Sequence, residues 1–384
     1  MNHMLHQTTF PSDLLRVDGA LDLEPTARGV RPRRLPAWTR PQLPDALFDL
    51  VAQSTAGVRI ALRTDATVIE LTLHVTQVEL PSGRTLPAVL DLVVNGEVTH
   101  RQTAAGGDVL RIMWGSSDVD IVPGTTETIR FTGLLRGDKD VEIWLPQAAA
   151  CDLVSLAADA PIHPATTSIA PRWVHYGSSI SHCVEADGPT GTWPAVAAAK
   201  ANLRLTDLGF SGNAMLDPFV ARTIRDLPAD LISLKIGANI VADATMRQRT
   251  FLPAVHGFLD TIRDGHPSTP IVVISPISCP PLENRPGPIM SAHPRPQEAT
   301  ETDTGALTMS AVRELLHGIV QDRTATDAAL SYVDGRALLG PDETGDLHDG
   351  IHPNAAAYRR MGGRFVSLLG LVDLQPGQAR STTS

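Results

Sequence analysis

Residues 173–180 decide the fold of this chain, and they have the sequence WVHYGSSI. The run from Trp173 to Tyr176 is mostly apolar and predicts a short buried strand, and Gly177 with the two serines after it predicts a turn. Further apolar runs occupy 203–210, 231–236, 271–274 and 330–333. Helical patterns occupy 193–201, 309–324 and 354–369. Such strands, alternating with helices, are typical of a parallel sheet covered on both faces, so we predict an α/β unit.

A different pattern precedes this unit. Between Val58 and about Pro146, apolar and polar residues alternate in short steps, which predicts half-buried strands. Asn95 and Gly96 follow one of these strands and favour a tight hairpin, because both residues tolerate a positive φ. We therefore expect an antiparallel β-sandwich ahead of the α/β unit. At 384 residues the chain also exceeds the usual size of a single core.

We predict four segments along the chain. Residues 1–45 form an N-terminal extension or linker, and residues 46–165 form the β-sandwich. Residues 166–375 form the α/β domain, and residues 376–384 form a disordered tail. The extension contains a basic run from Arg28 to Arg40 that prolines interrupt, which is typical of a solvated linker.

Bulk composition excludes several classes of protein. Hydrophobic residues make up 42% of the chain and charged residues 19%, the balance of a folded globular protein. The formal net charge of -10 argues against nucleic-acid binding, since phosphate neutralisation needs a basic surface. The cysteines at 151, 183 and 279 form neither a metal-ligand spacing nor a disulfide framework, which favours a reducing compartment.

The sequence shows neither a signal peptide nor an apolar run of membrane-spanning length. We therefore expect a cytoplasmic protein with no membrane partner, and secretion stays open if this start is not the native one.

Ser179, Asp349 and His352 are the residues from which chemistry is expected. Ser179 follows the end of a predicted strand, the place where open α/β sheets bind their ligands. Asp349 and His352 are three residues apart, a spacing that places both side chains on one side of a turn or helix. Ester hydrolysis through a covalent intermediate needs a nucleophilic hydroxyl, a base, and an acid that orients the base. These three residues fit those roles.

Two further strings with glycine follow the next two predicted strands. Residues 208–213 have the sequence LGFSGN, and residues 235–240 have the sequence KIGANI. Glycine lets the backbone come close to another group at these positions, and Asn239 adds a side-chain amide. About two or three preorganised N–H donors are what a tetrahedral oxyanion needs.

These four blocks, in this order over roughly 200 residues, make the chain similar to the SGNH hydrolases, also called the GDSL esterases and lipases. The resemblance implies a three-layer α/β/α domain with flavodoxin-like strand order, and it makes Ser179 the nucleophile. It makes His352 the base toward Ser179 and then the acid toward the leaving alcohol, with Asp349 orienting His352. It also implies an oxyanion hole formed by the backbone N–H groups of Ser179 and Gly212 and by the side chain of Asn239. The sandwich lies outside this resemblance.

Two residues depart from the family pattern. Ser178 and Ile240 stand where the family usually has aspartate. Carboxylate acceptors for nearby N–H groups are therefore missing from the loops that carry Ser179 and Asn239. We expect the Ser178 hydroxyl to replace one of these acceptors in part.

Other residues near the predicted site favour structural roles. We expect Cys183 to be a small buried residue rather than a thiol nucleophile, and Trp193 to be a core anchor rather than a substrate platform. A zinc spacing is not formed by the flanking histidines, which are His175, His182 and His348, so neither a metal nor another cofactor is expected. The proline-rich stretch 279–303 predicts either a lid or cleft wall, or an insertion with no role in binding.

The sequence therefore predicts a serine esterase for short acyl esters, with acetyl esters of a carbohydrate or another small molecule as the leading substrates. A sandwich ahead of such a domain resembles the arrangement in some carbohydrate acetyl esterases, whereas an aromatic content of 4% offers little for stacking on sugars. Two alternatives stay open, an acyltransferase with the same triad and a binding protein that has kept the fold without activity. The oligomeric state and the role of the sandwich are not determined by the sequence.

Overall fold

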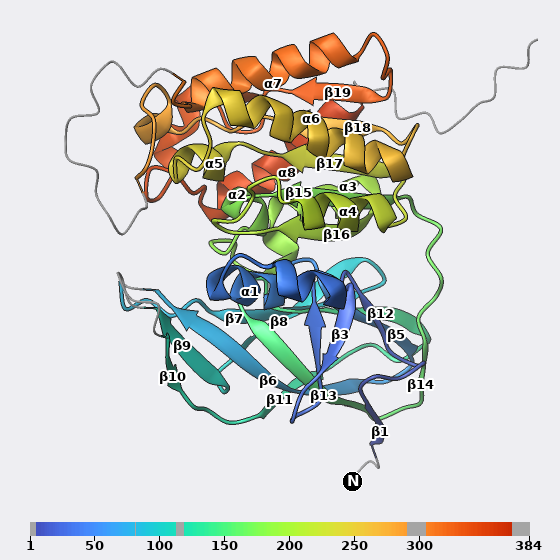
Figure 1. Ribbon diagram of the computed structural model, residues 1–384. Coiled ribbons are helices and arrows are strands. Elements are labelled where there is room, and N and C mark those ends of the chain that lie inside the picture. Colours follow the sequence, from blue (N-terminus) through green and yellow to red (C-terminus); the bar gives the residue numbers. More distant parts are fainter. Residues whose placement is uncertain (1–4, 81, 113–118, 290–304, 371–384) are drawn as a thin grey trace, which may run out of the picture.

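The computed structural model describes residues 5–80, 82–112, 119–289 and 305–370 of the 384. The predicted tail at 376–384 and part of the proline-rich stretch 279–303 lie outside these ranges. The described chain forms two stacked units, and Figure 1 shows the strand-rich first unit below the layered α/β unit.

The first unit consists of two sheets. One sheet has the strand order β10-β9-β6-β13-β4-β3, with β1 beside β13 and β11 beside β6. Its strands are β1 (His6–Thr9), β3 (Asp22–Pro25), β4 (Val30–Arg33), β6 (Val68–Glu79), β9 (Asp108–Ile112), β10 (Val119–Val122), β11 (Glu127–Thr132) and β13 (Ala150–Ala158). The other sheet has the order β14-β5-β12-β7-β8, with β2 beside β5. Its strands are β2 (Arg16–Asp18), β5 (Arg59–Thr64), β7 (Ala88–Val94), β8 (Glu97–Ala104), β12 (Lys139–Trp144) and β14 (Ile162–Pro164).

Alternation along these strands builds the core of the sandwich. In β6, Ile69, Leu71 and Leu73 are fully buried, whereas the residues between them are partly exposed. Side chains from both sheets join them in one apolar cluster, and each fully buried side chain of this size contributes about 1.5–3 kcal/mol. The predicted hairpin joins β7 to β8 with positive φ angles at Asn95 and Gly96. The predicted antiparallel sandwich is confirmed except for β6 and β9, which pair in parallel.

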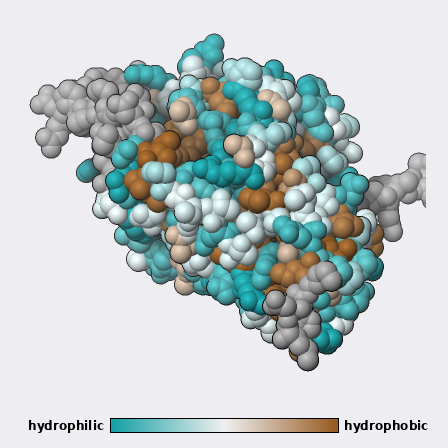
Figure 2. Space-filling model, turned by 90° about the horizontal axis from the view of Figure 1, so that it is seen from below, coloured by the Kyte–Doolittle hydropathy of each residue, from teal (hydrophilic) through white to brown (hydrophobic). Residues whose placement is uncertain are grey.

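The outer surface of this unit is mixed in character. Seen from the sandwich end, apolar residues lie in separate patches among hydrophilic ones (Figure 2).

The second unit is a parallel sheet with the strand order β16-β15-β17-β18-β19. Its strands are β15 (Arg172–Gly177), β16 (Arg204–Gly209), β17 (Leu231–Lys235), β18 (Ile271–Ile274) and β19 (Leu330–Val333). Numbered along the chain this order is 2-1-3-4-5, so the flavodoxin-like order that the family resemblance implies is confirmed.

Helices cover both faces of this sheet (Figure 1). One face carries α2 (Ser179–His182), α3 (Trp193–Ala201) and α8 (Ala355–Leu369). The other face carries α4 (Pro218–Asp226), α5 (Ala238–Ala242), α6 (Gln248–Gly265) and α7 (Met309–Arg323). Thr192, Thr308 and Asn354 begin α3, α7 and α8 by accepting a hydrogen bond from a backbone N–H of the first turn. Across the described ranges, the helices lack the combined length and apolar character that crossing a membrane needs.

The interpretation of Arg28–Arg40 as a solvated linker is wrong. This stretch includes β4, which pairs with β3 and β13, so residues from the predicted extension belong to the sandwich sheet. Arg33 forms ion pairs with Glu24 and Asp49. The basic side chains are retained inside the fold because acceptors surround them, which sequence spacing does not reveal. The boundaries proposed between the four segments stay predictions.

A helix that the sequence analysis did not predict follows this stretch. It is α1 (Ala46–Gln53), and the side chain of Asp45 caps its first turn. Phe48 of α1 packs against Phe210 and Phe219 of the α/β unit. The N-terminal part of the chain therefore contributes directly to the core of the second unit.

A polar contact region, which we call the seam, lies between the two units. It is formed by Arg34, Ser54 and Gln147 from the N-terminal side, and by His182, Asp207 and Ser211 from the α/β unit. Arg34 is fully buried and donates hydrogen bonds to the backbone oxygens of Val51, Ser54 and Gly209. The two units are thus joined by buried polar contacts as well as by apolar packing.

Candidate active site

Four segments meet at the carboxyl edge of the parallel sheet. Ser179 follows β15 and begins α2, Gly212 follows β16, and Asn239 lies in α5 just after β17. His352 precedes α8 and lies close to Ser179. Loops at the carboxyl ends of parallel strands share one edge of the sheet, which is why residues so distant in sequence come together.

Ser179, His352 and Asp349 form a continuous hydrogen-bonded chain. The Oγ atom of Ser179 lies 2.9 Å from Nε2 of His352, and Nδ1 of His352 lies 2.7 Å from Oδ2 of Asp349. Because an ionised carboxylate only accepts, Nδ1 carries the proton and Nε2 of the neutral ring is the acceptor. The Ser179 hydroxyl therefore donates to His352, which is the arrangement needed for a base to activate a hydroxyl.

The loop between Asp349 and His352 fixes the carboxylate as well. Oδ1 of Asp349 accepts from the backbone N–H groups of Ile351 and His352, at 2.9 and 2.7 Å. Partial burial opposes ionisation of Asp349, but hydrogen bonds from the ring and backbone of His352 hold its pKa well below the usual range. The acid is therefore ionised across the physiological range.

The groups around His352 favour the protonated form of its ring more than bulk water would. Burial of the imidazole opposes protonation, but the hydrogen bond that its Nδ1–H donates to Asp349 and the negative charges of Glu185 and Asp349 raise the pKa of His352 above its usual value of 6.5. A base with a raised pKa stabilises the imidazolium that forms when Ser179 loses its proton.

The turn that presents Ser179 depends on small residues. The hydroxyl of Ser178 accepts a hydrogen bond from the backbone N–H of Ile180 at 3.3 Å and so caps α2. The Ser178 hydroxyl thereby acts as the local acceptor that the sequence analysis expected. A side chain at Gly177 would place its Cβ 2.8 Å from Cβ of Ser181, so only glycine fits below this turn.

Three N–H donors at this edge of the sheet have no protein partner in the described ranges. They are the backbone N–H groups of Ser179 and Gly212 and the amide Nδ2 of Asn239. Oδ1 of Asn239 accepts from the backbone N–H of Ala214 at 3.1 Å, which fixes the amide and leaves its Nδ2 free. Gly212 has a φ of +71°, and the space where its Cβ would lie is open. Free donors of this kind are suited to binding a developing negative charge.

Most of the other residues weighed from the sequence have structural positions. Cys183 is fully buried, which raises the pKa of its thiol well above the usual value. Trp193 is also fully buried and donates its indole N–H to the backbone oxygen of Ile180, as predicted for a core anchor. His175 lies buried between the hydroxyls of Ser181 and Ser233. No cluster of three or more metal-ligating side chains occurs in the described part of the chain.

His348 supports the loop that carries the proposed base. Its backbone N–H and its Nδ1 atom both lie within hydrogen-bond distance of the backbone oxygen of His352, at 3.1 and 3.0 Å. The third flanking histidine, His182, belongs to the seam.

Sequence reasoning missed Glu185. This residue accepts a hydrogen bond from the buried hydroxyl of Tyr358 at 3.3 Å, and its charge acts on His352. Glu185 lies six positions after Ser179, but no motif singles it out. Only its approach to His352 in the fold indicates a role at the site.

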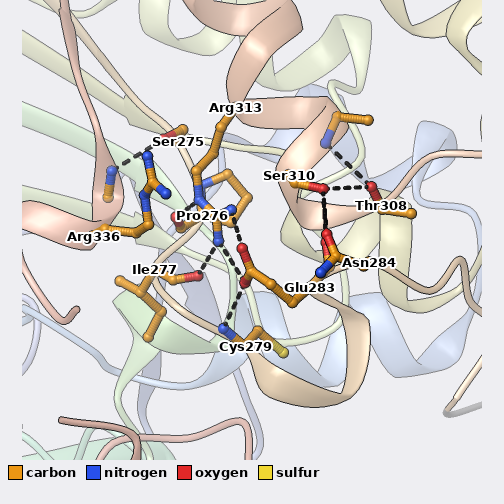
Figure 3. A network of polar contacts seen from close by, with 12 residues as sticks. Ser275, Pro276, Ile277, Cys279, Glu283, Asn284, Thr308, Ser310, Arg313 and Arg336 are labelled. Carbon is orange, nitrogen blue, oxygen red and sulfur yellow. Dashed lines mark hydrogen bonds and ion pairs between the residues drawn. The ribbon is translucent and has the colours of Figure 1, made fainter. Parts of the chain in front are cut away.

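The start of the proline-rich stretch is anchored beside this site. Figure 3 shows the guanidinium of Arg313 donating to the backbone oxygens of Pro276 and Ile277 and to the carboxylate of Glu283. A Cβ on Gly350, in the loop that carries Asp349, would lie 3.7 Å from the ring of Pro281. The start of this stretch is therefore held in place near the triad loop, and its residues 290–303 lie outside the described residues.

The chain is similar to a known protein family and to several solved structures. Residues 175–360 match the family model described as GDSL-like lipase/acylhydrolase. The solved structure of the salicylyl-acyltransferase SsfX3 from a tetracycline biosynthetic pathway has a TM-score of 0.80 and 27% identity, covering 97% of this chain and 99% of that one. A protein described as a GDSL-like lipase from Bacteroides ovatus has a TM-score of 0.68 and 20% identity, covering 96% and 98%.

A family two carbohydrate esterase from Clostridium thermocellum, solved in complex with cellohexaose, has a TM-score of 0.56 and 14% identity, covering 84% of this chain and 94% of that one. Likenesses at 20% and 14% identity establish a shared fold. No curated protein matches the chain.

Proposed function

The α/β unit belongs to the GDSL-like lipase/acylhydrolase family, whose model matches residues 175–360, and from this premise we propose that the chain is a serine esterase for short acyl esters. The observation that carries the proposal is the hydrogen-bonded chain from Ser179 through His352 to Asp349, next to three unpartnered N–H donors within the described residues. A nucleophile, its base and an anion site at one strand edge are the parts that acyl transfer requires.

The first half of the reaction acylates Ser179. Its Oγ attacks the carbonyl carbon of the ester while the hydroxyl proton moves to Nε2 of His352. The carbonyl oxygen becomes an oxyanion, which accepts hydrogen bonds from the N–H groups of Ser179 and Gly212 and from the amide of Asn239. The bond to the alcohol oxygen then breaks, and His352 returns its proton to that oxygen, so the alcohol leaves neutral.

The second half releases the acid. Water donates a proton to Nε2 of His352 and attacks the acyl carbon, the same donors hold the new oxyanion, and the proton returns to Oγ of Ser179. Asp349 stays ionised throughout and stabilises the imidazolium in both halves, because its low pKa keeps it from taking the proton.

Short acyl groups, acetyl first, are the proposed acyl side of the substrate, and an esterified carbohydrate or another small alcohol is the proposed leaving group. The likeness to a carbohydrate esterase solved with cellohexaose supports the carbohydrate version. Its identity of 14% limits that support to a shared architecture of sandwich and catalytic domain.

Acyl transfer to an alcohol is a second candidate function. It is favoured by the likeness to the salicylyl-acyltransferase SsfX3, which extends over nearly the whole of both chains at 27% identity. The same acyl-Ser179 intermediate serves both functions, and they differ in whether water or an alcohol attacks it.

A panel of p-nitrophenyl esters of increasing chain length, together with acetylated sugars, tests the proposal. We expect acetate and other short esters to give the highest kcat/KM, and Ser179→Ala to abolish turnover. Product analysis with an added alcohol separates the two functions, since a transferase gives mainly the new ester. Undiminished turnover by Ser179→Ala would overturn both.

A further inference from the structure

His182 connects the sandwich to the proposed active site. It is the last residue of α2, the short helix that Ser179 begins, and it is buried in the seam. Its Nε2 atom lies 2.7 Å from the backbone oxygen of Gln147 and 2.9 Å from Oγ of Ser54, both from the N-terminal side. Its Nδ1 atom lies 2.7 Å from Oγ of Ser211. One imidazole ring therefore spans the two units.

The direction of these hydrogen bonds follows from their partners. A backbone carbonyl only accepts, so Nε2 of His182 must carry the proton that it donates to Gln147. Burial, with the nearby positive charge of Arg34, lowers the pKa of His182 to about 3, so the ring is neutral. Nδ1 is then the unprotonated nitrogen, and the Ser211 hydroxyl donates to it. That hydroxyl proton is not available to a substrate.

Ser211 belongs to the loop that presents Gly212. The loop begins with the N–H of Phe210 bonded to the oxygen of Gly177, and ends with the N–H of Ala214 bonded to Asn239. Between these two points, the side chain of Asn213 bonds to the backbone oxygen of Ser211 within the loop. Among the hydrogen bonds of the described residues, the bond from Ser211 to His182 therefore ties the middle of the loop to the rest of the fold.

We infer that His182 is a positioning residue through which the sandwich holds the oxyanion loop in its working geometry. The backbone oxygen of Gln147 fixes the ring, the ring fixes the hydroxyl of Ser211, and Ser211 fixes the backbone N–H of Gly212. This inference rests on the proposed function, since it assigns the Gly212 N–H to the oxyanion. It gives the N-terminal sandwich a part in catalysis without any contact with the substrate.

A small buried hydrogen-bond network is well suited to holding the backbone N–H of Gly212 in place. An oxyanion donor is effective only when it is fixed in place before the charge develops, and small displacements weaken it. A neutral ring with both nitrogens paired is rigid, and here its carbonyl partner belongs to the sandwich.

Four variants of the full chain test the inference. Ser211→Ala removes the hydroxyl, and His182→Gln keeps an amide donor near the Nε2 position while removing the acceptor for Ser211. His182→Asn keeps an acceptor near the Nδ1 position while removing the donor that reaches Gln147. Ser181→Ala is the matched control, because it also breaks a bond between a serine and a buried histidine, at 2.8 Å from His175, but leaves the oxyanion loop untouched.

Two kinetic readouts and one stability readout are taken for each variant. They are kcat/KM for p-nitrophenyl acetate, the inhibition constant of butaneboronic acid, which places a boronate oxygen at the oxyanion position, and the urea midpoint. For Ser211→Ala, His182→Gln and His182→Asn we expect kcat/KM to fall about ten-fold and the inhibition constant to rise about ten-fold, less than the loss of a whole donor causes. Ser181→Ala is expected to lower the midpoint while both kinetic values stay within about two-fold of wild type.

The double variant His182→Gln/Ser211→Ala is expected to lose no more activity than either single variant, because both act through one link. Wild-type kinetics in Ser211→Ala would overturn the inference, as would an equal kinetic loss in Ser181→Ala. Wild-type kinetics in His182→Asn would show that the bond to Gln147, and with it the sandwich, does not affect the oxyanion loop. If the His182 variants fail to fold, the comparison of Ser211→Ala with its control Ser181→Ala still tests the inference. Ser179→Ala is assayed alongside, since its activity tests the proposed function independently of these outcomes.

Discussion

The carboxyl edge of the parallel sheet and the seam both gather polar groups, but they use them in opposite ways. At the edge, the N–H groups of Ser179 and Gly212 and the amide of Asn239 have no protein partner in the described residues. In the seam, the guanidinium of Arg34 and both ring nitrogens of His182 are bonded to protein oxygens. Unpaired donors cost stability until a ligand accepts from them, whereas paired donors fix the backbone around them.

This difference predicts two kinds of mutational effect. Changes at the edge should reduce catalysis and leave the fold nearly as stable as before. Changes in the seam should reduce stability first, and activity only where the seam reaches the loops of the site.

The largest effect is expected from His352→Ala, at the edge. The variant removes the base that accepts the Ser179 proton, so kcat for p-nitrophenyl acetate should fall by on the order of 10⁴-fold or more. The urea midpoint should stay close to that of wild type, because the ring lies at a partly open edge. His256→Ala, in α6 on the opposite face of the sheet, is the control and should keep full activity. A His352→Ala protein with more than a tenth of wild-type activity would contradict the assignment.

Arg34→Met should produce the largest effect in the seam. It leaves backbone oxygens of Val51, Ser54 and Gly209 without their donor, and it removes the positive charge that faces the fully buried Asp207. Breaking a buried contact of this kind should lower the free energy of unfolding by about 3–5 kcal/mol, measured by urea denaturation of the full chain.

The double variant Arg34→Met/Asp207→Asn sharpens this prediction. Burial raises the pKa of Asp207 to about 6 even with Arg34 present. Replacing the carboxylate by an amide keeps an acceptor for the N–H of Gly209 and removes the uncompensated charge, so part of the lost stability should return. A double variant no more stable than Arg34→Met would show that the unpaired backbone oxygens carry the whole effect.

Substitutions of Asn239 separate a loss of catalysis from a loss of stability at one side chain. Asn239→Ala should lower kcat by about 10²–10³-fold, since it removes an oxyanion donor, and should cost about 1 kcal/mol of stability because the N–H of Ala214 loses its acceptor. Asn239→Asp keeps that acceptor, removes the donor and places a carboxylate charge where the oxyanion would form. Its urea midpoint should therefore stay near wild type while kcat falls at least as far, and a fully active Asn239→Asp protein would exclude the amide from the oxyanion hole.

The smallest effect concerns the pH profile. His352 must be neutral to accept a proton, so a pKa raised above 6.5 places the acid limb of kcat/KM above that pH, and activity is lost as the pH falls through it. Glu185→Gln removes a negative charge that favours the imidazolium and keeps an acceptor for Tyr358. The acid limb should shift to lower pH, and a limb that stays in place or rises would contradict a role for Glu185.

Local sequence patterns predicted the strands of the parallel sheet and most of the residues that the structure brings together at the candidate site. Apolar runs gave all five strands, and glycine, serine and asparagine after three of them marked the edge where Ser179, Gly212 and Asn239 lie. The spacing between Asp349 and His352 was sufficient because both residues lie in one short loop, whose backbone itself binds the carboxylate.

Patterns failed where a polar residue depends on a distant partner. The interpretation of the basic run Arg28–Arg40 was wrong because arginine next to proline is usually solvated. In the fold, Arg34 instead donates to the backbone oxygen of Gly209, which is 175 positions away in the sequence. Glu185 and His182 carry no motif of their own. Their roles follow from Tyr358, Gln147 and Ser211, which approach them only after the sheet and sandwich have packed.

The sequence by itself determined the five strands of the α/β unit, three of its helices and the residue types at its carboxyl edge, because hydrophobic periodicity and turn chemistry act over a few neighbouring residues. The flavodoxin-like order of those strands was implied by the family resemblance. The tertiary structure alone decided that the N-terminal strands belong to the sandwich, that α1 packs into the core of the α/β unit, that Arg34 is buried, and that His182 links Gln147 to Ser211. A buried polar group is stable only with its partner in place, and that partner is chosen by packing rather than by position along the chain.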